Sequence, residues 1–346
     1  MEADRELTAR RKAVLLAAGP LHVPADFRPP FPVSRSTAGP GAGSTAIVLA
    51  FGGTMIKKAI TTAEAEFSLV GSGPRYEILR DGEPFIESAE IRPTVAHAPG
   101  QAFYNLDTEC IYHCRFCTSP SLDRRITKGL DPDRVVAMIL KAAEEREDMG
   151  AVAVTSAVVK DPQSTVDKLA YVLAKVRSKL PSIPIGVEPY IDNLAQVDQL
   201  KRAGADEIKL NIETFDRDIF QKVCGEQDLD RILDAIEHAV KVFGRGKVTS
   251  NIIVGMGETD ENVLEGVETL ARMGCIATLR PLRLNDINRG PMTEALGTLR
   301  PVDPERMLSL AKEHRAILER NGLTSYTLHT MCHQCGCCDI VPFRDI

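Results

Sequence analysis

The sequence predicts an α/β fold, namely a partial (β/α)6 barrel of the TIM type with an N-terminal extension and a C-terminal cysteine-rich tail. Two observations carry this prediction. From residue 99 on, six short apolar runs alternate with amphipathic stretches of helical period, which is the pattern of parallel strands joined by helices. Several of the helical stretches also begin at Asp or Ser and end near Gly, as capped helices do.

The elements of the predicted barrel follow in order along the chain. Strands are expected at residues 102–108, 151–158, 183–190, 206–213, 247–256 and 276–284. Helices are expected at residues 131–149, 164–180, 193–204, 228–244 and 259–274, with a last helix at 303–322. The active site of such a fold forms at the carboxyl ends of the strands. We assign residues 99–325 to the barrel and residues 326–346 to the tail.

Residues 1–98 are predicted to be an extension of short strands and loops rather than a full domain. They are rich in Pro, Gly and Ser, and residues 75–91 form a hairpin candidate with Asp81 and Gly82 at the turn. The segment GPGAGST at residues 39–45 has some likeness to a phosphate-binding loop. It lacks the lysine, however, and Pro40 interrupts it, so a plain loop is the better prediction.

Composition narrows the classes of function. The net charge of -6 and the pI near 5.7 do not favour a nucleic-acid partner. No apolar stretch has the length of a membrane span, and the charged start of the chain is not a secretory signal. We therefore expect a cytoplasmic protein without a membrane partner. In a reducing compartment its nine cysteines are expected to be metal ligands, catalytic thiols or core residues rather than disulfides.

The stretch TECIYHCRFCTSP places Cys110, Cys114 and Cys117 in the loop after the first barrel strand. Their spacing is C-x3-C-x2-C, and Phe116 precedes the last cysteine. A structural zinc site has four protein ligands, whereas this motif supplies three. A cubane cluster has four irons to ligate, so three thiolates leave one iron open to a small molecule. Zinc-binding or core cysteines are the alternative.

This motif in this position resembles the radical S-adenosylmethionine (SAM) superfamily. The resemblance implies a [4Fe–4S] cluster on the three cysteines, SAM bound to the open iron, and cleavage of SAM to a 5′-deoxyadenosyl radical. It also implies SAM contacts at the strand ends, within VTS at 154–156, NIET at 211–214 and GMGET at 255–259. The implied SAM-binding residues are Phe116, Thr155, Ser156, Asn211, Glu213, Gly255, Gly257 and Arg283.

Other polar residues at strand ends are further candidates. Asn211 and Glu213 alternate along one strand and therefore point to the same side. Arg283, with Asn285 and Arg289, is expected to hold either an anionic substrate or the SAM carboxylate, with a salt-bridged loop as the alternative. Glu188, at the end of the third strand, is a candidate active-site carboxylate.

The same blocks, in the same order, are similar to those of the lipoyl synthase and biotin synthase branch. Lipoyl synthases carry a second, N-terminal set of cysteines, whereas the first 109 residues here contain none. The additional cysteines are in the tail instead. A C-terminal set resembles a biotin-synthase-like subgroup, and it is also compatible with archaeal-type lipoyl synthases made of two proteins.

The tail sequence predicts a second metal site. Cys332, Cys335 and Cys338 have C-x2-C-x2-C spacing and are the preferred ligands of a second [4Fe–4S] cluster, with Cys337 as a candidate fourth ligand. A zinc site that includes His333 is the alternative, because mixed Cys and His ligands suit zinc.

The expected function is that of a radical SAM enzyme that takes a hydrogen atom from its substrate. The resemblance favours sulfur insertion into an acyl chain, such as an octanoyl group on a carrier protein. It implies an electron donor such as ferredoxin or flavodoxin, and a partner radical SAM synthase is an open expectation. Dehydrogenation, rearrangement or methyl transfer is one alternative. A zinc-binding module without enzymatic activity is another.

Overall fold

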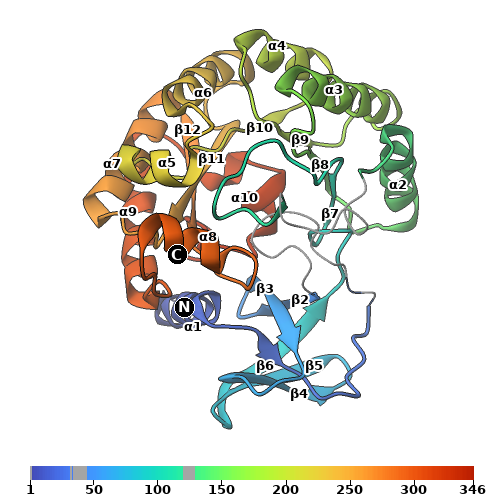
Figure 1. Cartoon of the computed structure of the whole chain (residues 1–346). Helices are drawn as coiled ribbons and strands as arrows, with labels where there is room; N and C mark the ends of the chain where they lie inside the picture. Colours follow the sequence, from blue (N-terminus) through green and yellow to red (C-terminus); the bar gives the residue numbers. More distant parts are fainter. Residues whose placement is uncertain (1, 32, 34–44, 120–128) are drawn as a thin grey trace.

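The computed structural model describes residues 2–31, 33, 45–119 and 129–346 of the chain. Two separate β-structures organise it, a small N-terminal barrel and a larger curved sheet surrounded by helices (Figure 1). Except for Thr45, the GPGAGST segment lies outside the described residues.

The N-terminal strands form a closed barrel in the order β1-β3-β2-β6-β5-β4. Side chains such as Leu49, Ile56 and Ile78 form a second hydrophobic core inside it. Residues 1–98 were expected to form less than a full domain. This expectation is corrected, because short strands become stable when they close into a barrel and leave no free edge. The strands are β1 (Leu21–His22), β2 (Ala46–Phe51), β3 (Thr54–Thr61), β4 (Phe67–Ser72), β5 (Arg75–Arg80) and β6 (Glu83–Arg92).

The predicted hairpin is confirmed as the β5–β6 pair. The two strands are antiparallel. The turn residues Asp81 and Gly82 have φ values of 50° and 88°, as a two-residue hairpin turn requires. The tail packs against both β-structures. The predicted division of the chain into residues 1–98, 99–325 and 326–346 therefore stays a prediction.

The second β-structure confirms the predicted partial barrel. It is a six-stranded parallel sheet in the order β12-β11-β10-β9-β8-β7, with helices around its outer face (Figure 1). Its strands are β7 (Gln101–Asn105), β8 (Ala151–Thr155), β9 (Ile185–Glu188), β10 (Glu207–Lys209), β11 (Val248–Val254) and β12 (Cys275–Pro281).

The helices around the sheet begin where the sequence supplies capping side chains. Carboxylates accept backbone N–H groups at the N-caps of α2, α3, α5, α6 and α9, which satisfies donors that the helix itself leaves free. The sequence analysis did not predict α5 and α8. The helices are α2 (Pro132–Glu145), α3 (Pro162–Lys179), α4 (Leu194–Arg202), α5 (Arg217–Cys224), α6 (Leu229–Phe243), α7 (Asp260–Met273), α8 (Arg289–Leu296) and α9 (Pro304–Arg320).

The cysteine-rich tail lies inside the curve of the sheet, where α10 (Met331–Cys335) occupies the centre of Figure 1. Gln101, the first residue of β7, exchanges two hydrogen bonds of 2.8 Å with the backbone of Met331. Gly186 in β9 leaves room for Thr330, because a Cβ there would lie 2.3 Å from the Thr330 hydroxyl oxygen. The tail therefore fills the end of the barrel at which the strands begin.

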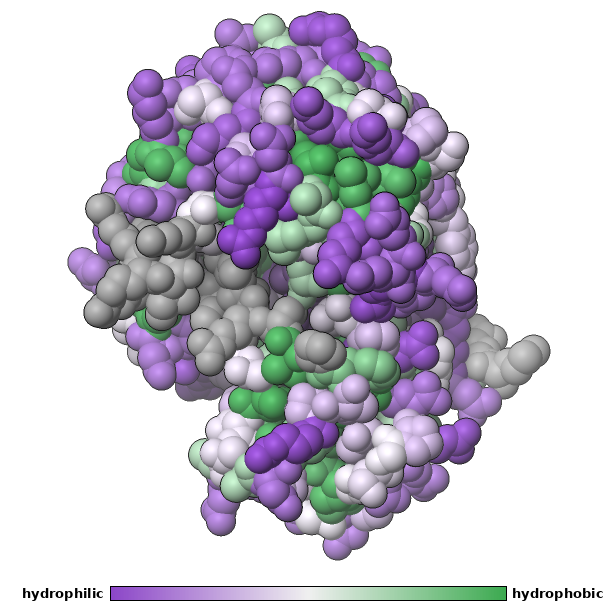
Figure 2. Space-filling model, turned by 90° about the vertical axis from the view of Figure 1, so that its right-hand side faces the viewer, coloured by the Kyte–Doolittle hydropathy of each residue, from purple (hydrophilic) through white to green (hydrophobic). Residues whose placement is uncertain are grey.

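Helix α1 (Glu2–Ala17) was also not predicted, and it packs against α9 and β3. It brings the N-terminus close to the C-terminus (Figure 1). Figure 2 shows hydrophilic side chains over most of one face of the molecule, with hydrophobic ones gathered between them. Among the residues that are placed, no helix has the length and hydropathy needed to cross a membrane.

Candidate active site

The three cysteines of the C-x3-C-x2-C motif lie in the loop after β7, at the carboxyl end of the sheet. Their thiols are free and half-buried. Burial raises the pKa of Cys117 to about 11 and also raises that of Cys110, and in both cases neighbouring thiols of the motif add to the shift. The Cys114 thiol is also close to the buried thiol of Cys224 in α5, where a hydrogen bond between the two raises the pKa of Cys224.

Residues far away in the sequence hold this loop. The backbone N–H of His113 donates to the Glu226 carboxylate at 2.6 Å. The side-chain amide of Asn288, which is 1% exposed, donates to the carbonyl oxygen of Phe116 at 2.9 Å. Glu226 and Asn288 were not predicted, because nothing in their local sequence indicates a contact with the loop.

Thr155 and Ser156, predicted SAM contacts, follow each other at the end of β8. The Thr155 hydroxyl donates to the Glu188 carbonyl oxygen at 2.9 Å. The Ser156 hydroxyl donates to the Asp107 carboxylate at 3.3 Å and accepts from the Asp107 N–H at 3.2 Å. In this structure both hydroxyls tie strand ends together, and their part in SAM binding stays a prediction.

Asn211 and Glu188 are brought together on the concave side of the sheet. The Asn211 amide donates to the Glu188 carboxylate at 2.9 Å, and Lys209 Nζ lies 3.3 Å from the same carboxylate. Burial favours the neutral form of Glu188, but Lys209 and Asn211 outweigh it and hold the pKa of Glu188 below its usual value. Lys209 was not recognised from the sequence, where it is one charged residue in a strand.

Glu213 follows the same strand and is distinctive in two ways. Its φ is 60°, a left-handed conformation that is uncommon for a residue other than glycine. Burial raises the pKa of Glu213 to about 7, against the opposing effect of Lys209. Backbone strain and a shifted carboxylate at one strand end are typical of functional sites.

The GMGET turn after β11 is organised by its own glutamate. The Glu258 carboxylate accepts the N–H groups of Gly255 and Met256, each at 2.7 Å, and pairs with Arg306 at 3.0 Å. A Cβ on Gly255 would lie 2.5 Å from Val302, whereas a Cβ on Gly257 would meet nothing within 4 Å. Gly255 is therefore required by packing, and Gly257 leaves the turn open on one side.

The residues after β12 form a loop that leads into α8. Asn288 also donates to the Arg283 carbonyl oxygen at 3.0 Å and accepts from the Asn285 N–H at 2.8 Å. Arg289 begins α8, and its N–H donates to the Asn285 carbonyl oxygen. The predicted anion-binding roles of Arg283, Asn285 and Arg289 stay predictions.

All four tail cysteines line one small cavity of about 10 Å³. Besides them, the lining consists of His97, Phe103, Arg280 and Met331. His333, which the zinc alternative would need, does not line it, and its Nε2 contacts the Thr278 hydroxyl at 3.1 Å instead. The structure thus brings Cys332, Cys335, Cys337 and Cys338 together without His333.

Buried basic side chains surround the tail cysteines. The Cys332 sulfur lies 2.5 Å from Arg280 Nη2 and 3.1 Å from Lys209 Nζ. Lys57, from strand β3 of the N-terminal barrel, donates its backbone N–H to the Cys337 carbonyl oxygen at 3.0 Å. Burial lowers the pKa of Lys57, and the charges of Cys338, Cys335 and Cys337 oppose that shift. A buried cation needs a negative partner, and thiolates or a thiolate-bound metal centre would supply it.

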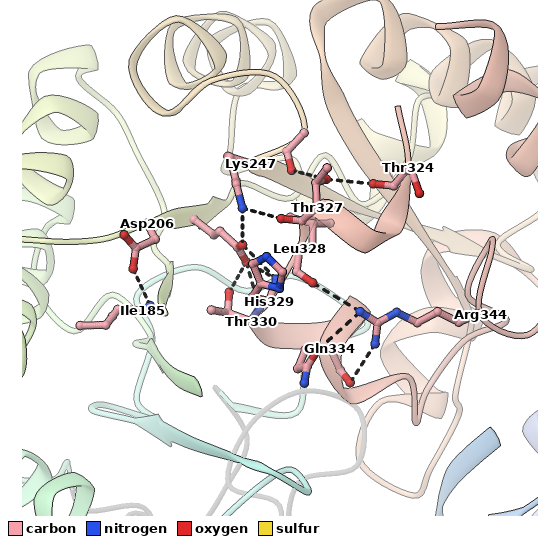
Figure 3. A network of polar contacts seen from close by, with 12 residues as sticks. Ile185, Asp206, Lys247, Thr324, Thr327, Leu328, His329, Thr330, Gln334 and Arg344 are labelled. Carbon is pink, nitrogen blue, oxygen red and sulfur yellow. Dashed lines mark hydrogen bonds and ion pairs between the residues drawn. The ribbon is translucent and has the colours of Figure 1, made fainter. Parts of the chain in front are cut away.

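The tail is fixed at the amino ends of the strands by a polar network (Figure 3). Glu207, the first residue of β10, accepts the N–H groups of His329 and Thr330 at 2.9 and 3.0 Å and the Thr330 hydroxyl at 2.6 Å. Lys247 Nζ pairs with Glu207 at 3.1 Å. In the same view, Arg344 donates to the Leu328 carbonyl oxygen at 3.4 Å.

The N-terminal region holds the other side of the tail. Lys12 of α1 is fully buried, and its Nζ lies 2.6 Å from both the Gly336 carbonyl oxygen and the Asp345 carboxylate. The Thr54 hydroxyl donates to the same carboxylate at 2.5 Å. Gly336, between Cys335 and Cys337, has a φ of 62°. The turn that presents two of the cysteines is therefore held by the first helix of the chain.

Both groups of thiols fit iron–sulfur ligation by the chemistry of their donors. Within the described residues, no three His, Cys, Asp or Glu side chains already converge as metal ligands. The loop nevertheless offers three soft thiol donors at the carboxyl end of the sheet, and the tail offers four around one cavity beside buried cations. Thiolates are the ligands that such clusters use.

Comparisons with known proteins agree with this arrangement. Residues 104–270 match the model of the Radical SAM superfamily. The lipoyl synthase of Caldicellulosiruptor saccharolyticus is 25% identical over 50% of this chain and 60% of its own length. The lipoyl synthase of Shouchella clausii is 29% identical over 49% and 53%. A probable GTP 3′,8-cyclase of Thermococcus kodakarensis is 23% identical over 51% and 54%. The chain thus spans little more than half the length of these relatives.

Solved structures show the same fold at low sequence identity. Methylornithine synthase has a TM-score of 0.50 and 15% identity, over 64% of this chain and 69% of its own. The FeFe-hydrogenase maturase HydG from Carboxydothermus hydrogenoformans has a TM-score of 0.52 and 16% identity, over 65% and 52%. The matched domain, the sheet and the placement of the cysteine loop lead to one conclusion: residues 104–270 of the chain belong to the radical SAM superfamily, and lipoyl synthases are among their relatives.

Proposed function

We propose that this radical SAM enzyme inserts sulfur into its substrate, with SAM bound at the loop cysteines and the sulfur held by a cluster on the tail cysteines. The observation that carries the proposal is the placement of the two cysteine groups. One lies at the carboxyl end of the sheet, and the other lies inside the barrel, beside Phe103 of β7 and Arg280 of β12. A substrate in the space between them would face both.

When bound, the two clusters and SAM would supply the electron transfer, the carbon radical and the sulfide. The residues of the chain would bind SAM and exclude water. Asn211 and Glu213 would hold SAM, and the buried pair of Glu188 and Lys209 would fix Asn211 in place. The tail, which Glu207 and Lys247 hold in place, would keep water out at the end of the barrel where the strands begin. Exclusion of water protects a radical and strengthens the polar contacts around it.

The proposed SAM contacts can be tested by binding. Asn211→Ala and Glu213→Ala are each expected to weaken SAM binding by about tenfold or more, since each removes a hydrogen bond in a buried site. The iron content of both sites should stay unchanged. Loss of iron in these variants would instead make the two residues structural.

The similarity to lipoyl synthases supports an acyl group, such as octanoyl on a carrier protein, as one candidate substrate. Radical SAM enzymes need a reductant, and ferredoxin or flavodoxin is the proposed donor, with a partner synthase as an additional component to be supplied. The test is to load the tail site with ³⁴S-sulfide, add SAM, reductant and octanoylated carrier, and search by mass spectrometry for labelled product. Transfer of ³⁴S to the substrate is the expected result of sulfur insertion, and a labelled octanoyl product would identify the acyl group as that substrate.

A second candidate is a radical rearrangement in which the tail cluster only transfers electrons. The specific observation in its favour is the similarity to a probable GTP 3′,8-cyclase, at an identity close to that of the lipoyl synthases. In that case 5′-deoxyadenosine forms while product without ³⁴S accumulates. A colourless tail site that binds zinc would contradict both candidates.

A further inference from the structure

The inner face of the sheet carries polar side chains from every one of its strands. Paired residues on neighbouring parallel strands point to the same face, and the register joins Asn105 to Thr155 and Thr155 to Glu188. At the opposite edge of the sheet, Arg280 of β12 is paired with Ile253 of β11. This face includes the polar residues Asn105, Thr155, Glu188, Lys209, Asn211, Asn251 and Arg280, beside the apolar Phe103 and Ile253.

Such a lining suits a saturated acyl chain poorly. Each methylene group gains about 0.8 kcal/mol on burial only when its new surroundings are apolar. A buried polar group that loses water without a new partner costs about 1–3 kcal/mol. An octanoyl chain placed against Lys209, Glu188 and Arg280 would gain little, because the surface that it would cover is charged.

Three polar atoms on this face already lack a partner. Among the described residues, Asn105 Oδ1, Asn251 Oδ1 and Arg280 Nε are buried and make no hydrogen bond. Asn251 is only 8% exposed. Buried polar groups in native proteins are nearly always paired, so unpaired atoms that share one concave face point to a polar ligand.

We propose that the substrate is a polar molecule with a carboxylate or a similarly compact anionic group, and that Arg280 binds that group while Asn105 and Asn251 bind neighbouring polar atoms. The guanidinium uses Nη2 for Cys332, while the Nε–H on the same edge makes no hydrogen bond. Guanidinium groups recognise carboxylates through such an edge. Because Arg280 lies beside the tail cysteine, this anion is distinct from the carboxylate of SAM at the loop. The inference rests on the proposed radical SAM activity and names its substrate class.

The test uses the cluster-loaded protein with SAM and reductant, and it measures 5′-deoxyadenosine. Two probes have the same eight-carbon chain: an octanoyl-lysine peptide and octanedioate, which ends in two carboxylates. Shorter dicarboxylates down to succinate complete the series, each in deuterated form. At least one dicarboxylate is expected to raise the rate about tenfold or more and to transfer deuterium to 5′-deoxyadenosine. The octanoyl peptide should do neither.

Variants identify the residue responsible. Arg280→Gln should abolish the dicarboxylate effect, Arg280→Lys should keep part of it, and both should bind SAM as the wild type does. Arg245→Gln, on the surface, is the matched control and should behave as the wild type. The proposal is wrong if the octanoyl peptide is the better probe, if no dicarboxylate separates wild type from Arg280→Gln, or if Arg280→Gln loses tail iron. Absence of any 5′-deoxyadenosine from the loaded wild type would instead reject the proposed function.

Discussion

The two cysteine groups of this protein share a barrel but differ in their surroundings. The loop cysteines are half-buried at the carboxyl end of the sheet, near the Cys224 thiol of α5 and the Glu226 carboxylate. The tail cysteines line an enclosed cavity beside Arg280 and Lys209. An open site with three thiols suits a cofactor that must enter and leave. An enclosed site with four thiols and buried cations suits a centre that stays.

The N-terminal region of the chain contacts the second site. Lys57 contributes a backbone hydrogen bond and a buried charge, and Lys12 holds the turn at Gly336. These contacts give the N-terminal region a role that its sequence does not reveal. The comparison therefore predicts that changes in this region affect the tail site and spare the loop site.

The largest expected effect separates the two sites by their chemistry. Changing Cys110, Cys114 and Cys117 together to Ala should abolish formation of 5′-deoxyadenosine from SAM, because no thiolates remain to hold the first cluster. Changing Cys332, Cys335 and Cys338 together to Ala should leave 5′-deoxyadenosine formation measurable and remove only the substrate product. Chromatographic assay of both variants, with wild type as reference, checks this. Equal loss of 5′-deoxyadenosine in both variants would contradict the assignment of different chemistry to the two sites.

A smaller effect tests the role of α1. Lys12→Met leaves the buried Asp345 carboxylate without its cation, and breaking a buried ion pair of this kind costs about 3–5 kcal/mol of stability. Thermal unfolding should show the loss, and iron analysis should show depletion of the tail site alone. Lys241→Met, which removes an exposed pair with Glu237, is the matched control and should change stability by less than about 0.5 kcal/mol. Equal iron loss from both sites would contradict this role of α1 at the tail site.

Packing of the tail inside the barrel gives a third test. In Gly186→Ala the new methyl group would lie 2.3 Å from the Thr330 hydroxyl oxygen, so the tail must shift, at a cost of about 1–3 kcal/mol. Gly150→Ala is the control, because its Cβ would approach only the Gly100 carbonyl oxygen, at 4.0 Å. Denaturant unfolding and tail iron content measure both. A stable, fully loaded Gly186→Ala variant would show that the tail does not occupy this position.

The last test concerns pH. Burial raises the pKa of Glu213 to about 7 from an ordinary value of 4.5, so the folded protein holds this proton more tightly than the unfolded chain. The stabilising contribution is complete below pH 4.5 and is lost as the pH rises through 7, at about 1 kcal/mol per pH unit. In the metal-free protein, Glu213→Gln should therefore show a flatter stability profile between pH 5 and 7. Parallel profiles for both proteins would show that Glu213 has an ordinary pKa when folded.

Sequence reasoning succeeded where the signal is local and failed where it depends on long-range contacts. The six strands, the Asp81–Gly82 hairpin and the superfamily follow from periodicity, turn chemistry and cysteine spacing, and all three predictions are confirmed. The closed N-terminal barrel was missed because closure depends on pairing between distant strands. Asn288, Arg280 and Lys57 were missed for the same reason, since only the fold brings them beside the cysteines.

The most direct test of the account is the metal content of the variant without loop cysteines. After anaerobic reconstitution, the wild type should contain about eight irons and the variant about four, with a brown colour and the Mössbauer spectrum of a [4Fe–4S] cluster. That result would place a cluster on Cys332, Cys335, Cys337 and Cys338. A colourless variant that contains zinc, or one that contains no metal, would contradict the central claim that the tail is an iron–sulfur site.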